Sequence, residues 1–429
     1  MFLIKTTDEN FNSRFNKLLS RGTMDMEQVA KIVKDIIKEI RYEGNEALKR
    51  HIAKFDRWEI KKDSDLVVVP RDMKRAYDRL DSKLRDALHL AYDRIRDYHK
   101  KQMPKSWIDF DNANNTLGQK ITPVDRAGLY IPGGKAAYPS SLLMNAIPAI
   151  VAGVKEIIVT TPTPDNEINE LLLATAHLCK ITKMFKVGGA SAIAAMAYGT
   201  QTIPKVDVIT GPGNIFVATA KKVVYGDVNI DMIAGPSEIG ILADDTAIPE
   251  YLAIDLLSQA EHDEMASSIL ITSSEKLAKS VQELIYIELE KLERKTIAKK
   301  SIKKRGAIIV TKTIKEAVEL MNKIAPEHLE VVTVNPFELL PHIKHAGAIF
   351  LGSFTPESIG DYIAGPNHTL PTGGTAKFYS PLSVENFLKK SSIIAMSKDG
   401  INEIGKACAL LAKAEGLTAH EKSVRIRLK

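Results

Sequence analysis

The feature that most constrains the fold is an alternation of short apolar runs with longer amphipathic stretches, which begins after about residue 119. Examples of the apolar runs are Glu156–Thr161, Val206–Thr210 and Ser268–Thr272, each followed by a segment with helical spacing. Strands buried on both faces of a parallel sheet have this continuous apolar character, and helices carry the chain back between them. The alternation therefore predicts an α/β fold made of βα units with largely parallel sheets.

The length of the chain predicts more than one domain, because 429 residues exceed what one compact core accommodates. The strand–helix units at Glu156–Thr161 and Ser268–Thr272 are weakly similar to each other, as expected for two α/β domains of related build. Before them, apolar residues at three- and four-residue spacing predict helices over Met26–Phe55 and Arg71–Met103, with a break at Val67–Pro70.

The composition is that of an ordinary soluble globular protein, with 45% hydrophobic and 26% charged residues. The net charge of +6 is modest, and the basic runs Ala298–Arg305 and Ser423–Lys429 contain no aromatic residues. We interpret these runs as solvated surface rather than as a nucleic-acid interface. No apolar run is long enough to cross a bilayer, and the apolar start Met1–Lys5 is too short for a signal peptide. A cytoplasmic location is therefore expected.

Several potentially reactive residues have plain structural interpretations. Cys179 and Cys408, the two cysteines, lie in apolar helical sequence and are expected to be buried small hydrophobes. His51, His89 and His99 lie among charged helical residues and are expected to be exposed or to cap helices.

A glycine-rich turn is the best candidate for binding a nucleotide. Gly211–Asn214 follows the apolar run Val206–Thr210 and precedes a helix, and glycines there would let backbone amides approach an anionic group. Phe216 stands where the third glycine of the dinucleotide fingerprint would be, so a tight turn without a ligand is an alternative. Glycine pairs at Gly133–Gly134 and Gly188–Gly189 end other strands, and the carboxyl ends of parallel strands line one crevice. Their convergence favours a binding site.

A second candidate site combines amide, imidazole and carboxylate side chains. Gln259 and His262 are three residues apart near a helix end, hence on one face, and oxygen and nitrogen ligands without cysteine suit zinc or manganese in an open site. Each further acid or histidine also has a plain interpretation as a loop or cap residue. The further candidates are Glu327 with His328, Asp361 with His368, and Glu415 with His420.

Taken together and in this order, these stretches resemble the histidinol dehydrogenase family from about residue 24 onward. The resemblance rests on nine ordered sequence words: Gly211-Pro-Gly-Asn214, Ala234-Gly-Pro-Ser-Glu238, Gln259-Ala-Glu-His262, Ala325-Pro-Glu-His-Leu-Glu330, Thr355-Pro-Glu357, Gly360-Asp361, Ala364-Gly-Pro-Asn-His-Thr-Leu-Pro-Thr372, Ser380-Pro-Leu-Ser383 and Glu415-Gly-Leu-Thr-Ala-His420.

The resemblance implies the oxidation of L-histidinol to L-histidine, through an enzyme-held aldehyde, with two hydride transfers to NAD. It implies one Zn²⁺ per subunit, with Mn²⁺ as a substitute, that also binds the substrate. His328 would be the general base and a substrate contact, and Glu327 would activate the water that hydrates the aldehyde. The implied metal ligands are Gln259, His262, Asp361 and His420, and the further substrate contacts are Ser237, His368 and Glu415.

The implied NAD contacts are Tyr130 and Asn214, with one departure from the family pattern. This chain has Ser191 where the family commonly has glutamine, so a contact there is expected only through water. The resemblance also implies a homodimer with shared active sites, in which Glu415 and His420 complete the partner's site.

The expected architecture is two related, incomplete Rossmann-like α/β domains with small helical segments at both ends. The expected ranges are 1–23 for an N-terminal helical segment, 24–129 with 239–381 for the domain that carries the metal and acid–base residues, 130–238 for the NAD-binding domain, and 382–429 for a C-terminal helical segment that crosses to the partner subunit.

Two other functions are compatible with parts of the sequence. One is a related zinc- and NAD-dependent dehydrogenase of another small alcohol, such as a sulfopropanediol, but Ala364–Thr372 and Glu415–His420 match the histidinol version. The other is a nucleotide-binding scaffold without activity, against which the complete set of candidate metal and acid–base residues argues.

Overall fold

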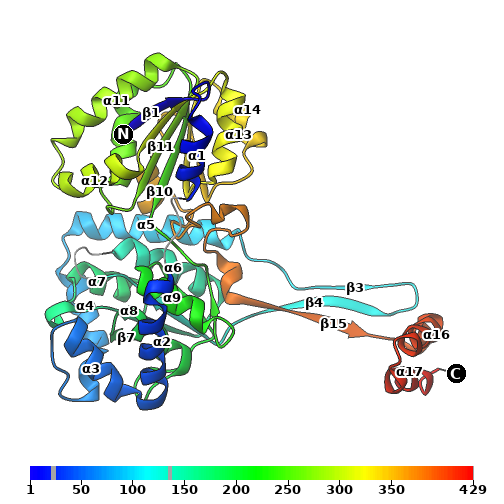
Figure 1. The fold of residues 1–429 in the computed structure, drawn as a ribbon. Helices are drawn as coiled ribbons and strands as arrows, with labels where there is room; N and C mark the ends of the chain where they lie inside the picture. The colour runs from blue at the N-terminus through cyan, green and yellow to red at the C-terminus, as the bar shows by residue number, and fades with distance from the viewer. Residues whose placement is uncertain (21–25, 134–137, 429) are drawn as a thin grey trace.

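The computed structural model describes residues 1–20, 26–133 and 138–428. It consists of two stacked α/β units and a long arm that projects from one side (Figure 1). Gly134 and the expected boundary between residues 23 and 24 lie outside the described residues. None of the described helices combines the length and apolar character needed to cross a bilayer.

The first unit is built on a parallel sheet with the strand order β1-β12-β11-β10-β13-β14. Its strands are β1 (Phe2–Lys5), β10 (Glu238–Ala243), β11 (Ser267–Thr272), β12 (Ala307–Val310), β13 (His328–Val332) and β14 (Ala348–Leu351). Apolar side chains of α10 (Pro249–Ala260), α11 (Glu275–Leu289) and α12 (Lys295–Arg305) form the core on one face. Those of α1 (Phe11–Leu19) and α13 (Ile314–Ile324) form the core on the other. The short helices α14 (Pro336–Leu339) and α15 (Glu357–Tyr362) flank β14.

The second unit has a sheet of the order β2-β7-β6-β5-β8-β9, parallel except for the edge strand β2. Its strands are β2 (Val67–Val68), β5 (Arg126–Tyr130), β6 (Glu156–Thr161), β7 (Lys183–Lys186), β8 (Val208–Thr210) and β9 (Asn229–Ile230). One face packs against α2 (Met26–Glu43), α3 (Asn45–Phe55), α8 (Gly189–Tyr198) and α9 (Ile215–Val224). The other packs against α4 (Pro70–Arg79), α5 (Ser82–Lys100), α6 (Pro139–Ala152) and α7 (Glu170–Leu178).

The two sheets share one topology. Five strands of each run in the order third, second, first, fourth, fifth, which is the order of a Rossmann fold without its sixth strand. The predicted pair of related, incomplete Rossmann-like units is therefore confirmed.

The sheets divide the chain differently from the expected ranges. Strands β2 and β5 place most of residues 24–129 in the second unit, whereas the expectation assigned them to the unit with residues 239–381. The N-terminal segment is not wholly helical, because β1 pairs with β12 at the edge of the first sheet. Both differences concern pairing with strands far away in sequence, which local spacing does not encode.

The arm is a three-stranded antiparallel sheet that carries the C-terminal helices at its end (Figure 1). Its strands are β3 (Trp107–Phe110), β4 (Thr116–Pro123) and β15 (Leu388–Ala395), and α16 (Lys398–Ala414) and α17 (Thr418–Arg425) follow. The expectation that residues 382–429 form a helical segment is therefore wrong for the part that forms β15. The sequence of that strand shows no alternation of apolar and polar residues, and its pairing with β4 decides its conformation.

Three predictions about single residues are also wrong. Cys408 is exposed on α16, whereas Cys179 is buried as predicted. His51 and His99 are buried rather than exposed. Their imidazole nitrogens all have partners inside the protein, which makes their burial tolerable.

The turn after β8 requires glycine at position 211. Gly211 has a φ of +119°, and a Cβ added there would lie 2.0 Å from the Tyr130 carbonyl oxygen. The close approach lets the chain leave β8 beside the end of β5, where the candidate nucleotide residues gather.

Candidate active site

The candidate site residues gather where the two units meet. Ser237 precedes β10, His262 lies between α10 and β11, and His328 is the first residue of β13, so all three lie at the amino edge of the first sheet. Tyr130 ends β5 and Asn214 follows β8, which places both at the carboxyl edge of the second sheet. Only residues 231–237 separate β9 from β10, so these two edges lie close together.

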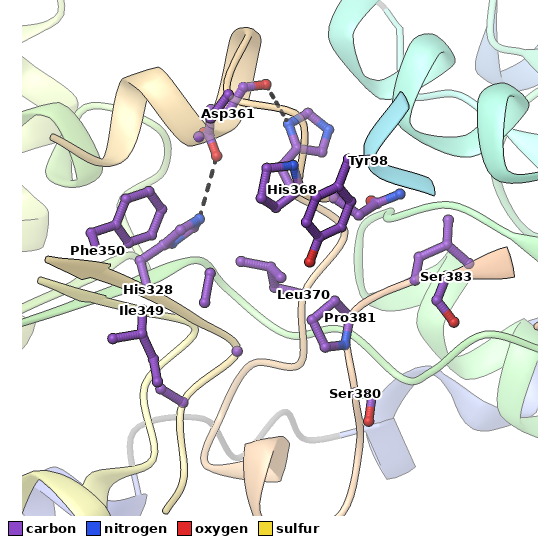
Figure 2. A pocket seen from close by; sticks show the side chains of 18 of the residues that line it. Tyr98, His328, Ile349, Phe350, Asp361, His368, Leu370, Ser380, Pro381 and Ser383 are labelled. Atoms are coloured by element: carbon purple, nitrogen blue, oxygen red, sulfur yellow. Dashed lines mark hydrogen bonds and ion pairs between the residues drawn. The ribbon is translucent and has the colours of Figure 1, made fainter. Parts of the chain in front are cut away.

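A cavity of about 700 Å³ opens between the units. Tyr98 and Gln102 from the end of α5 line one side, and His328, Asp361 and His368 line the other (Figure 2). Asp361 links the two histidines: its Oδ1 lies 3.4 Å from His328 Nε2, and its backbone oxygen lies 3.0 Å from His368 Nδ1. The cavity thus contains two imidazoles held by one residue, His328 by the carboxylate of Asp361 and His368 by its backbone oxygen.

The geometry around His328 determines which ring nitrogen is basic. Its Nδ1 lies 3.1 Å from the Glu238 carbonyl oxygen, which can only accept a hydrogen bond, so Nδ1 carries a proton. Among the described residues, its buried Nε2 has no hydrogen-bond partner. In the neutral ring, Nε2 is therefore the free base that faces Asp361 and the cavity.

Glu327 is fixed by its neighbours on the adjacent strand. Its Oε2 accepts a hydrogen bond of 2.8 Å from the Glu238 backbone amide and lies 3.7 Å from His328 Nδ1. Burial raises the pKa of Glu327 to about 8. A carboxyl group that titrates near neutral pH can exchange a proton with a substrate or a water molecule.

His328 lies among carboxylates that favour its charged form. Burial disfavours the imidazolium, but Glu357, Glu327 and Asp361 outweigh this effect and raise the pKa of His328 well above its usual value. In turn, burial opposes the ionisation of Asp361, but the His328 imidazole outweighs it and lowers the pKa of Asp361. Burial also raises the pKa of Glu357 to about 8. The cluster has an excess of buried carboxyl groups, which favours a cation.

The described residues contain one group of three acids or histidines that could hold a metal ion. Ligand atoms of His262, Glu357 and Asp361 all lie within 4.8 Å of one another. Gln259 is buried beside them, and one end of its amide meets the Glu357 carboxylate. We assign this end as the nitrogen, because it can donate to carboxylate oxygens and the amide oxygen cannot. The structure therefore brings Gln259, His262 and Asp361 together.

The other two predicted contacts, Glu415 and His420, are not part of this cluster in the described chain. Glu415 caps the end of α16 and His420 lies on α17, at the tip of the arm and away from both units (Figure 1). Both side chains are exposed.

The predicted NAD contacts already have partners within the protein. The Tyr130 hydroxyl accepts a hydrogen bond of 3.3 Å from the Gly189 amide, and the Asn214 side chain caps α9 by accepting from two backbone amides. Ser191, in the first turn of α8, has its Oγ 2.9 Å from His51 Nδ1. All three residues lie at the carboxyl edge of the second sheet.

Comparison with known proteins decides the family. The family model described as histidinol dehydrogenase matches residues 19–428. The chain belongs to the histidinol dehydrogenase family. It is 67% identical over 428 residues to the histidinol dehydrogenase of Sulfurimonas denitrificans, with 99% of this chain and 100% of that protein covered. It is 66% identical to that of Wolinella succinogenes, with 97% of each chain covered.

A crystal structure of histidinol dehydrogenase from Elizabethkingia anophelis has the same fold. The TM-score is 0.94 at 36% identity, and the match covers 100% of this chain and 98% of the other. The predicted family is confirmed. The chain is thus an oxidoreductase of histidine biosynthesis, as its family name states.

Two groups of residues at the candidate site are not predicted from the sequence. Glu357 was noted only within the word Thr355-Pro-Glu357, and no local signal indicates that its carboxylate reaches Gln259. The second group supports the loop that carries His368. Asn367 donates to the Met144 carbonyl oxygen at 2.6 Å and lies 3.3 Å from His99 Nε2, while Arg94 donates to two carbonyl oxygens of the same loop.

The raised pKa of Glu327 predicts a stability effect that depends on pH. The folded state holds the Glu327 proton up to about pH 8, whereas the ordinary pKa is 4.5, so its contribution to the free energy of unfolding falls as pH rises between these values. We expect the melting temperature of Glu327→Gln, relative to the unsubstituted protein, to increase from pH 5 to pH 8.

Thermal denaturation of metal-free protein across this range measures the effect. Glu338→Gln, at an exposed position of the same unit, is the control and should show no such trend. A melting-temperature difference for Glu327→Gln that stays constant with pH would contradict the prediction.

Proposed function

We propose that this chain oxidises L-histidinol to L-histidine through L-histidinaldehyde, with one Zn²⁺ per subunit, or Mn²⁺ as a substitute, and with NAD as hydride acceptor. The observation that carries the proposal is the cluster of His262, Asp361 and buried Gln259 beside Nε2 of His328, which faces the cavity. The family membership sets the reaction, and the cluster supplies the groups that the reaction requires. We also propose a cytoplasmic location for the protein.

The donor set fits zinc. Gln259, His262 and Asp361, with His420 from a partner subunit, would hold the ion, and oxygen and nitrogen donors are suited to a catalytic zinc site. When bound, zinc would supply Lewis acidity and a template for the substrate. His328 would become available as a base once a divalent cation neutralises the carboxylates that now raise its pKa.

The carboxyl edge of the second sheet fits NAD. Tyr130 and Asn214 would contact the cofactor, beside the glycine turn at Gly211, and ligands of open α/β sheets bind at such an edge. Ser191 would contribute to NAD binding while its hydroxyl stays hydrogen-bonded to His51. NAD would supply the acceptor for both hydrides.

The chain's own residues would handle the protons. His328 Nε2 would accept the hydroxyl proton as the alcohol becomes an aldehyde. Glu327 would take a proton from the water that adds to the aldehyde, so that a hydrated aldehyde enters the second oxidation. Ser237, His368 and the partner's Glu415 would hold the substrate in the cavity.

The experiment that tests the function is an assay of NADH formation from L-histidinol, before and after removal of the metal. We expect two NADH per histidinol, loss of activity on chelation and recovery with Zn²⁺. A sulfopropanediol and other small polyols serve as comparison substrates. Faster turnover of one of these would favour a related alcohol dehydrogenase, and absence of NADH with every substrate would contradict the proposal.

The two oxidations should respond differently to the loss of Glu327. Glu327→Gln should slow the conversion of histidinaldehyde to histidine more than the oxidation of histidinol, because only the former requires an activated water. Single-turnover measurements started from the alcohol and from the aldehyde separate the two steps. Equal slowing of both steps would refute the role of Glu327.

We propose a homodimer in which the arm completes the partner's site. In the single chain, the arm exposes apolar side chains such as Phe110, Leu411 and Ile426, which a second copy could cover. Glu415 and His420 lie on the terminal helices of the same arm, away from the other site residues (Figure 1). The exchange of arms would bring these two residues to the cavity of the other subunit.

Mixed dimers test this sharing. A Glu327→Gln chain is co-expressed with a His420→Ala chain, and the mixed dimer is purified with two different tags. If sites are shared, both substitutions fall in one site and the other site is intact, so about half of the activity should return. If each chain forms its own complete site, both sites carry one defect and no recovery occurs.

A further inference from the structure

The orientation of one buried amide determines whether it can bind a metal ion. Gln259 is fully buried near the end of α10, where its side chain meets the carboxylate of Glu357. The amide has two possible orientations, and the hydrogen-bonding groups around it are satisfied in only one of them. In that orientation the amide nitrogen lies 2.7 Å from Glu357 Oε1 and 3.2 Å from Oε2. In this orientation the amide oxygen faces donor groups instead of acceptors.

The two ends of an amide have opposite electrostatic character. Only the oxygen has a lone pair that can coordinate a cation, while the nitrogen carries two donor hydrogens. The terminal torsion of glutamine has two broad, roughly equivalent states, so the side chain itself does not select one. The neighbouring groups must therefore decide which end of the amide faces Glu357 and which end faces away from it.

Glu357 is placed to make that decision. With a divalent cation at the neighbouring ligand atoms, Glu357 would be ionised. An ionised carboxylate has only acceptor oxygens, so it attracts the amide nitrogen and repels the amide oxygen. Glu357 is buried, and its backbone amide donates to Glu330 Oε1 at 2.8 Å, which anchors the first turn of α15. Asp361 lies four residues further along the same helix, so α15 holds both this acceptor and a candidate ligand.

We propose that Glu357 is a positioning residue that turns the oxygen of Gln259 towards the metal, and that it acts as a hydrogen-bond acceptor and not as a ligand. Both of its oxygens are engaged by the nitrogen of one amide, which favours this role over direct coordination. This inference rests on the zinc site proposed above. Glu357 would enable the Gln259 amide, a weak and neutral ligand, to bind the ion.

Zinc affinity is the direct readout. The full-length protein is stripped of metal and titrated with Zn²⁺ in competition with a chromogenic chelator. Glu357→Ala should weaken zinc binding by about 10- to 100-fold, which is the usual effect of removing an outer-shell partner of a metal ligand. Glu357→Gln keeps an acceptor oxygen for the Gln259 amide, so its affinity should stay close to that of the unsubstituted protein.

A double-substitution cycle tests whether Glu357 acts through Gln259. In a Gln259→Leu background, Glu357→Ala should cause little further loss, because the amide that it orients is absent. Asp56→Asn, which neutralises a buried carboxyl group in the second unit, is the control and should leave zinc affinity unchanged. Circular dichroism verifies that each variant is folded.

The outcomes separate this inference from the proposed function. Equal losses in Glu357→Gln and Glu357→Ala, or full additivity with Gln259→Leu, would make Glu357 a ligand and overturn the inference. Unchanged affinity in Glu357→Ala would also overturn it, while the zinc site would stand if Asp361→Asn still lost the metal. Unchanged affinity in Asp361→Asn would overturn the zinc site and the inference together.

Discussion

Replacement of His328 by asparagine should lower the turnover of L-histidinol by about 10²- to 10⁴-fold, the range typical of a lost general base. The asparagine amide can still donate to the Glu238 carbonyl oxygen in place of Nδ1, but it has no group at the position of Nε2. The substitution therefore removes the free base and keeps the hydrogen bond that holds the side chain.

Three measurements give this prediction its specificity. Turnover is measured at saturating histidinol and NAD, bound zinc is measured by elemental analysis, and the pH dependence of the rate is recorded. We expect zinc to remain bound and the base-dependent limb of the pH profile to disappear. His89→Asn, at a half-buried histidine on α5 that contacts Tyr77, is the matched control and should retain its activity.

An unchanged pH profile in the variant would assign the base to another group. The nearest other proton acceptors are Asp361, Glu357 and Glu327, and the last of these has its pKa raised to about 8. Its titration would then appear in the profile of both proteins.

His262→Ala should release the metal and abolish turnover together. The turn after α10 holds His262 close to Asp361, and the loss of one imidazole donor leaves a site with fewer ligands. Because removal of an outer-shell partner already weakens metal binding by about 10- to 100-fold, removal of a direct ligand should weaken it more.

Zinc content after dialysis and zinc affinity by chelator competition measure the effect. Excess Zn²⁺ should restore part of the activity if the variant binds the ion more weakly but in the same place. His342→Ala, at an exposed histidine of the same unit, is the control for the loss of an imidazole. Full zinc occupancy in His262→Ala after dialysis would remove this residue from the set of ligands.

The location of the cluster in the fold differs from the common arrangement of α/β enzymes. Ligands usually bind at the carboxyl edge of a parallel sheet, and the nucleotide candidates Tyr130 and Asn214 follow that pattern in the second unit. His262 and His328, in contrast, lie at the amino edge of the first sheet. Two sheets of one topology thus present opposite edges to the candidate site, which lies between them.

The sequence by itself determined the parts of this protein that depend on short-range order. Apolar runs and helical spacing indicated the βα units, the glycine at position 211 marked the turn beside Tyr130, and the ordered words around Gln259, His328 and Asp361 indicated the family. Such features are local because backbone conformation and periodic burial act over a few residues.

The tertiary structure decided what depends on partners far away in the chain. Pairing with β4 made a strand of residues 388–395, and pairing within the second sheet assigned β2 and β5 to that unit. The burial of His99 beside Asn367 and the contact between Glu357 and Gln259 likewise depend on segments far apart in the chain. Hydrogen bonds and charges act through space, so the partners of a buried polar group are set by packing and not by its sequence neighbours.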